Sequence, residues 1–176
     1  MVNTKATPDD PRTDPPPTAG ERETLEAFLD WYRATIRLKA TGVADDDARR
    51  RLVPSATTLG GIVKHLRWVE LNWFEVVLAG RDRASLPTPP WTDDDPDADF
   101  RMEPHETLDE LLELYDAQCA RSREIAATRG LDDVGRHRRL GQVSLRWIYV
   151  HMIEETARHA GHADILRELT DGATGD

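Results

Sequence analysis

Apolar residues recur at helical spacing in four stretches of the chain, from about residue 21 to 39, 58 to 78, 107 to 128 and 144 to 169. In each stretch the apolar side chains lie three and four positions apart, so they share one face of an α-helix. Four amphipathic helices predict an all-α protein built as a four-helix bundle. The bundle is expected to span residues 20–176 as one domain.

The segments before and between these stretches are polar and contain many prolines. Residues 1–19 have too few apolar side chains to pack, so a disordered or loosely packed N-terminal arm is expected. Residues 80–105 form a long irregular connection, which can cross the bundle and let the second and third helices run parallel. In this connection, Trp91 is expected to anchor the chain to the bundle surface rather than to act as a lid. Residues 131–143 are expected to be a second polar connector.

The expected inward face of the last helix carries polar side chains between apolar ones. It presents Glu155, His159 and His162, with His151 at its edge. An unpaired carboxylate in an apolar core costs several kcal/mol, so a compensating group is expected beside Glu155. Glu155 and His159 are four positions apart, and they therefore lie on the same side of the helix and can converge on one ion.

A third candidate ligand, His65, lies at the edge of the apolar stripe of residues 58–78. A lone histidine there is more often a core-edge residue bonded to a neighbour, but together with Glu155 and His159 it completes a three-ligand set. Neutral imidazole and carboxylate suit zinc, and nickel, manganese or iron stay open. Three protein ligands and one open position are typical of catalytic zinc. Glu70 and Asn72 are candidates for orienting the His65 imidazole.

Charge and hydropathy exclude several partners. The formal net charge of −10 argues against binding to the phosphate backbone of nucleic acids. No apolar run approaches the ~20 residues that cross a bilayer, and the N-terminus lacks the apolar region of a signal peptide. A cytoplasmic protein without nucleic-acid or membrane partners is therefore expected, and a homodimer remains open. The single cysteine, Cys119, is expected to be a small buried apolar residue rather than a nucleophile.

Two stretches, GGIVKHLRWVELNWF and WIYVHMIEETARHAGHADILRE, resemble the DinB superfamily. More narrowly, they are similar to its mini-circle protein-like branch, which includes mycothiol transferases, over most of residues 21–170. The resemblance implies a four-helix bundle in which one histidine of the second helix and a pair four apart on the fourth hold a divalent metal. Matched by position, these ligands are His65, Glu155 and His159. Many members carry histidine where this chain has Glu155, a variant that resembles the mycothiol-dependent maleylpyruvate isomerase.

The resemblance implies a metal-dependent enzyme that activates a low-molecular-weight thiol, such as mycothiol, for attack on a small electrophile. Two other functions stay open: metal-dependent hydrolysis with Glu154 or His151 as the base, and a metal-binding stress protein without catalysis. A metal-free bundle with hydrogen-bonded polar residues is the remaining interpretation. His151 and His162 are expected at the rim of the site, and Arg158 is expected to contact an anionic substrate or Glu154.

Overall fold

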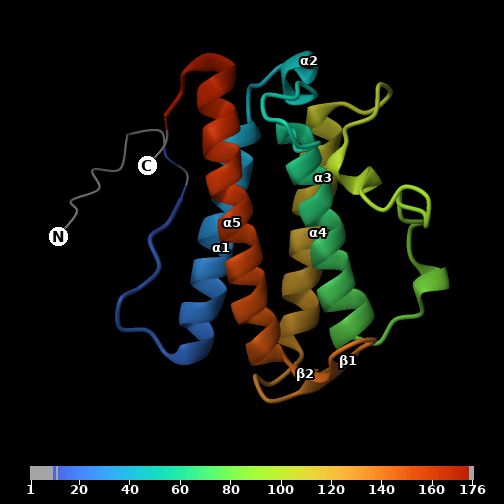
Figure 1. Ribbon diagram of the computed structural model, residues 1–176. Helices are drawn as coiled ribbons and strands as arrows, with labels where there is room; N and C mark the ends of the chain where they lie inside the picture. The colour runs from blue at the N-terminus through green and yellow to red at the C-terminus, as the bar shows by residue number, and fades with distance from the viewer. Residues whose placement is uncertain (1–9, 11, 175–176) are drawn as a thin grey trace.

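The computed structural model describes residue 10 and residues 12–174, and this part of the chain is mostly helical. The long helices lie side by side in Figure 1: α1 (Glu21–Ala40), α3 (Leu59–Glu70) with its continuation η1 (Leu71–Leu78), α4 (Leu108–Ala127) and α5 (Leu145–Asp171). The shorter elements are α2 (Asp45–Ala48), the 3₁₀ helices η2 (Arg83–Ser85) and η3 (Ala98–Phe100), and the strands β1 (Val134–His137) and β2 (Gly141–Ser144). The prediction of a helical fold is confirmed. Of the arm predicted for residues 1–19, residues 1–9 and 11 lie outside the described residues.

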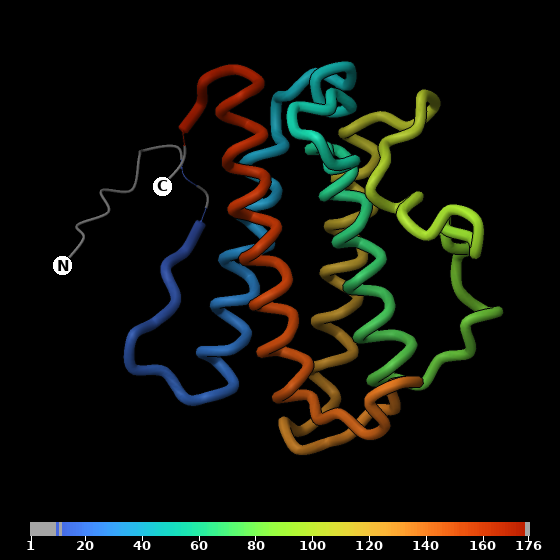
Figure 2. Tube along the Cα trace, in the orientation of Figure 1, coloured from blue at the N-terminus to red at the C-terminus, as the bar shows by residue number. Residues whose placement is uncertain are grey.

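The direction of each helix follows from the course of the chain in Figure 2. Helices α3 and α4 start at the same end of the molecule and run in the same direction, and α1 and α5 run in the opposite direction. Residues 79–107 return along the outside of α3 to the start of α4. We call this segment the strap. It contains η2 and η3, and η3 packs against α3, the helix that carries His65.

Buried apolar side chains from all the long helices form the core. One cluster surrounds Ile62, Leu66 and Tyr115, and a second surrounds Phe74 and Ile148. Burying a side chain of this size contributes about 1.5–3 kcal/mol to folding, so these clusters fix how α3, α4 and α5 pack. None of the helices among the described residues is both long enough and apolar enough to cross a membrane.

Helix ends follow the signals in the sequence. Thr107 and Glu110 form a capping box at the start of α4. The Ser144 hydroxyl accepts a hydrogen bond from the Trp147 backbone N–H (3.2 Å) at the start of α5. Gly172 ends α5 in the left-handed conformation, with φ of 78°. The Ser144 cap sets where α5 begins. It therefore helps to determine which α5 side chains lie at the level of His65.

Two connections contain structure that the sequence analysis did not predict. Residues 131–143 were expected to be a plain polar connector, but β1 and β2 pair there as an antiparallel hairpin with Gly135 opposite Val143. A Cβ atom on Gly135 would lie 2.2 Å from the carbonyl oxygen of Val77, so only glycine lets β1 approach η1 this closely. The polar connection after α1 contains α2, and its Asp45 side chain accepts a hydrogen bond from the Leu108 N–H (2.8 Å) at the start of α4.

Candidate metal centre

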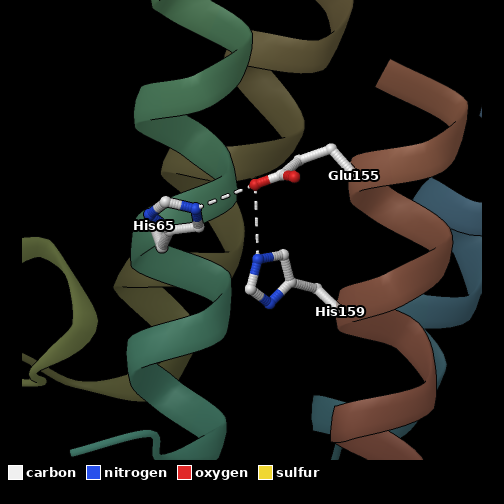
Figure 3. Close-up of side chains that lie close together, drawn as sticks. All are labelled: His65, Glu155 and His159. Atoms are coloured by element: carbon white, nitrogen blue, oxygen red, sulfur yellow. Dashed lines mark hydrogen bonds and ion pairs between the residues drawn. The ribbon is translucent and has the colours of Figure 1, made fainter. Parts of the chain in front are cut away.

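The three predicted ligands meet between α3 and α5 (Figure 3). His65 comes from the middle of α3, and Glu155 and His159 come from successive turns of α5. One donor atom from each lies within 4.8 Å of the other two. The Oε1 atom of Glu155 is 3.4 Å from Nε2 of His65 and 3.4 Å from Nε2 of His159. The helical spacing of Glu155 and His159 thus brings both side chains to one point, which α3 completes.

These separations suit a metal ion better than direct hydrogen bonds. At 3.4 Å the contacts are long for N–H···O bonds, which have donor–acceptor distances near 2.9–3.0 Å. Two ligand atoms on a tetrahedral zinc ion are about 3.3 Å apart, given zinc–ligand bonds of about 2.0–2.1 Å. Two imidazoles and one carboxylate are also a donor set that a divalent ion of the zinc type accepts. The residues present therefore fit such an ion.

The charge state of the site is set by contacts among these same groups. The contact with the His159 imidazole, followed by that with His65, holds the pKa of Glu155 well below its usual range. Burial lowers the pKa of His65, but the hydrogen bond with Asp99 and the nearby Glu155 carboxylate outweigh burial and raise this pKa above its ordinary value. Glu155 is thus a carboxylate at neutral pH, and its negative charge favours a cation between it and the imidazoles.

Asp99 is a residue of the site that sequence reasoning missed. Its Oδ2 atom lies 2.8 Å from Nδ1 of His65, and its side chain is buried. When Asp99 accepts a hydrogen bond from Nδ1–H, the Nε2 atom of a neutral His65 carries a lone pair. This lone pair faces the Glu155 carboxylate. Two acceptors facing each other need a proton or a metal cation between them. No local signal distinguishes Asp99 from the other aspartates of the strap, because its place depends on how the strap folds onto α3.

The two other residues proposed to orient His65 do not do so. Glu70 is fully buried and accepts hydrogen bonds from Nε and Nη2 of Arg33, both at 2.7 Å. It therefore belongs to an ion pair with α1, and the prediction that it orients His65 is wrong. Asn72 has no hydrogen bond to His65 among the described residues.

The remaining histidines of α5 lie at different depths. His162, which spacing places on the inward face and which was expected at the rim of the site, is exposed, and its ring centroid lies 5.4 Å from that of His159. His151 is half-buried, stacks on Trp147 at 5.2 Å between ring centroids and contacts Trp73 edge-on at 4.6 Å. Burial lowers the pKa of His151 below its ordinary value, so its imidazole is neutral at physiological pH.

Three further predictions are met by the contacts. Arg158 pairs with Glu154 and also lies 3.7 Å from a Glu155 oxygen. Trp91 packs edge-on against Trp68 of α3, with ring centroids 5.4 Å apart, so it anchors the strap to the helices. Cys119 is buried, and burial raises the pKa of its thiol, so it is no nucleophile at neutral pH.

The fold and the site define a helical protein with a candidate divalent-metal centre between two of its helices. The family model of the mycothiol-S-transferases matches residues 24–172, and the chain therefore belongs to the mycothiol-S-transferase family. The resemblance seen in the sequence is confirmed by this match. A search of curated protein sequences found no match.

The chain is also similar to a solved structure, the crystal structure of a conserved protein from Enterococcus faecalis. The two share 17% sequence identity and a TM-score of 0.64, over 85% of this chain and 96% of that chain. At this identity the likeness concerns the fold alone. It supports the arrangement of the helices and says nothing about the chemistry of the site.

Proposed function

We propose that the protein is a metal-dependent transferase that activates a low-molecular-weight thiol, such as mycothiol, for attack on a small electrophile. The observation that carries the proposal is the convergence of His65, Glu155 and His159 in a chain of the mycothiol-S-transferase family. These three side chains are proposed to hold one divalent metal ion. Zinc is the first candidate from the donor set, with nickel, manganese and iron as alternatives.

A bound divalent ion supplies one chemical effect: it lowers the pKa of a thiol, so that the nucleophilic thiolate exists at neutral pH. The residues around the ion prepare the site for this. Glu155 contributes the negative charge, and the Asp99 hydrogen bond turns Nε2 of His65 toward the centre. His151, neutral and one helical turn before Glu155, is available to accept the thiol proton.

The proposed reaction is a substitution at carbon. With a chlorinated acceptor, the sulfur forms a C–S bond while the C–Cl bond breaks and chloride leaves with its electron pair. With an epoxide, the C–S bond forms as a ring C–O bond breaks, and the ring oxygen takes up the proton released by the thiol. Both reactions balance without an oxidant or a reductant.

The test is to mix zinc-loaded protein with mycothiol and a chlorinated or epoxide acceptor, and to measure the conjugate by mass spectrometry. Conjugate is expected with the wild type and not with His65→Ala. His105→Ala is the matched control, because His105 is exposed on the strap and should not affect turnover. Equal rates for wild type and His65→Ala, each corrected for the uncatalysed reaction, would show the mechanism to be wrong.

Metal-dependent hydrolysis is the second candidate, favoured by the neutral His151 imidazole beside the centre. The same metal ion would then lower the pKa of water to about 7. Omitting the thiol separates hydrolysis from thiol transfer. Turnover of the acceptor without mycothiol supports hydrolysis, and dependence on mycothiol supports transfer.

A cytoplasmic location and pairing of two copies remain predictions of the sequence.

A further inference from the structure

We infer that the strap is part of the metal centre, and that Asp99 is a positioning residue that fixes the His65 imidazole for metal binding. The inference rests on the proposed function, because it assigns a role toward the same ion. It concerns a residue outside the three-ligand set and a segment, residues 97–102, outside the long helices.

The contact between Asp99 and His65 is short and protected from solvent. The Oδ2–Nδ1 distance is 2.8 Å, and the side chains of His65 and Asp99 are only 14% and 11% exposed. Within the described part of the chain, this imidazole is the sole ion-pair partner of Asp99. A buried carboxylate without a compensating contact is costly, so Asp99 and Nδ1–H satisfy each other. The lone pair of Nε2 then faces the point where the three donors meet.

A flat aromatic contact restricts the same imidazole from a second direction. The ring of Phe100 stacks on His65, with centroids 3.9 Å apart and planes inclined by 19°. The hydrogen bond selects the tautomer, and the stacked ring limits tilting of the imidazole out of its plane. Asp99 and Phe100 are adjacent on η3, so one short helix supplies both restraints.

Two glycines in the first turn of α3 let η3 approach this closely. A Cβ atom on Gly61 would lie 1.9 Å from the carbonyl oxygen of Phe100, and one on Gly60 would lie 2.7 Å from Sδ of Met102. Glycine within a helix costs about 0.8–1.0 kcal/mol relative to alanine, so this pair weakens α3 by itself. The close approach of the strap backbone is a structural reason for Gly61, whereas Gly60 faces the flexible side chain of Met102.

A lysine one residue before His65 holds the strap in the same place. Nζ of Lys64 donates a hydrogen bond to the carbonyl oxygen of Arg101 (3.0 Å) and pairs with the Glu106 carboxylate at 2.9 Å. Lys64 is itself buried, so these contacts are shielded from solvent. The strap is therefore held directly after Asp99, where Phe100 lies against Gly61 and where Lys64 binds Arg101 and Glu106.

The second imidazole of the centre has no such hydrogen bond. The Nδ1 atom of His159 is buried and has no hydrogen-bond partner among the described residues. Removal of the Asp99 carboxylate should therefore act through His65 alone. The inference predicts an asymmetric centre: the strap accepts a hydrogen bond from His65 but none from His159, although the Phe100 ring lies 5.9 Å from the His159 ring as well.

The first test measures zinc affinity by competition with a chromophoric chelator. Asp99→Ala should weaken zinc binding roughly 10–100-fold, as loss of a hydrogen-bond partner of a metal ligand does elsewhere. Asp99→Asn should lose less zinc affinity, because its amide oxygen can still accept a hydrogen bond from Nδ1–H. Asp97→Asn is the matched control, since it removes the same charge from an exposed position two residues away. Wild-type affinity in Asp99→Ala would overturn the inference while leaving the proposed function intact.

The second test needs no metal and so separates the two proposals. Imidazole ¹⁵N NMR of the metal-free protein at alkaline pH should show His65 as the Nδ1–H tautomer, and Asp99→Ala should lose this preference. An Nε2–H tautomer in the wild type would overturn the inference, whether or not the protein binds zinc. Absence of zinc binding by the wild type would overturn the proposed function instead.

A third variant tests the glycines. Gly61→Ala should displace η3 and weaken zinc binding, although the changed atom belongs to no ligand. Gly161→Ala is the matched control, because a Cβ atom on that exposed helical glycine meets nothing within 4 Å. If Gly61→Ala and Gly161→Ala bind zinc equally well, the strap is not part of the centre.

Discussion

Two carboxylates, the fully buried Glu70 and the partly buried Glu155, differ in what surrounds them. Glu70 meets a guanidinium in a fork, with two contacts of 2.7 Å to Arg33, and its side chain is fully buried. Glu155 faces two imidazole nitrogens at 3.4 Å, and its side chain is 16% exposed. The first carboxylate is neutralised by a short bidentate pair that leaves no place for an ion. The second has partners that are themselves metal ligands, at the separation a metal requires.

The difference shows that burial and charge alone do not identify a metal site. Both glutamates are candidates by the rule that a buried charge needs a partner. The nature of the partner separates them, because a permanently charged guanidinium closes a site and an imidazole leaves it open to a proton or a metal. We therefore expect Glu70 to govern stability and Glu155 to govern metal binding.

The largest expected effect is a loss of stability when the ion pair between Glu70 and Arg33 is broken. Glu70→Ala leaves the buried Arg33 guanidinium paired only with the half-exposed Asp30 and removes its two contacts to Glu70. The substitution should reduce the unfolding free energy by about 3–5 kcal/mol. Urea denaturation followed by far-UV circular dichroism measures this loss. Zinc affinity of the folded fraction should stay near that of the wild type. Unchanged stability together with lost zinc binding would reverse the assignment of the two carboxylates.

The next largest expected effect is a loss of zinc affinity when Glu155 is replaced. Glu155→Gln removes one of three ligands, whose combined binding energy is on the order of 10 kcal/mol, and should weaken zinc binding by about 100-fold or more. The unfolding free energy of the metal-free variant should change by less than about 1 kcal/mol. Competition titration measures the zinc affinity, and urea denaturation measures the unfolding free energy. A large stability loss with intact zinc binding would make Glu155 a structural residue like Glu70.

A smaller effect is the stabilisation of the whole protein by the metal. At free zinc of a hundred times Kd, folding should gain about 3 kcal/mol, which raises Tm by about 5–10 °C for a protein of this size. Differential scanning calorimetry with and without zinc tests this. His159→Ala should show no such shift, whereas the control His105→Ala should keep it.

The smallest effect is the pH dependence of the metal-free protein. The pKa of Glu155 is lowered in the folded state, so its stabilisation is present above the ordinary value of 4.5 and is lost as pH falls through the folded pKa. The pKa of His65 is raised, so its stabilisation is present below 6.5 and is lost as pH rises through the folded pKa. The stability difference between wild type and Glu155→Gln should therefore be greatest between these two values. A difference that grows steadily above neutral pH would contradict this account.

The sequence predicts the parts of the site that depend on helical spacing. Glu155 and His159 are four positions apart on one long periodic helix, so their convergence follows from local geometry. The link to His65 came from the need to compensate a buried charge and from the family resemblance. The long helices, the capping box and the anchoring role of Trp91 were accessible for the same reason, because each rests on local pattern.

What the sequence did not predict depends on contacts between distant segments. Asp99 is one of many strap aspartates, and only the approach of η3 to Gly61 distinguishes it. The pairing of Glu70 with Arg33 joins two helices, and nothing in the spacing of either helix indicates it. His162 lies three positions after His159, so spacing places it on the same helical face, but the structure leaves it exposed.

The most direct test of the metal centre is the metal content of the purified protein after loading with zinc and removal of excess ion. Inductively coupled plasma mass spectrometry should find about one zinc per chain in the wild type and in His105→Ala. It should find almost none in His159→Ala that circular dichroism shows to be folded. A wild type that retains no zinc, or a His159→Ala variant that retains as much as the wild type, would contradict the account.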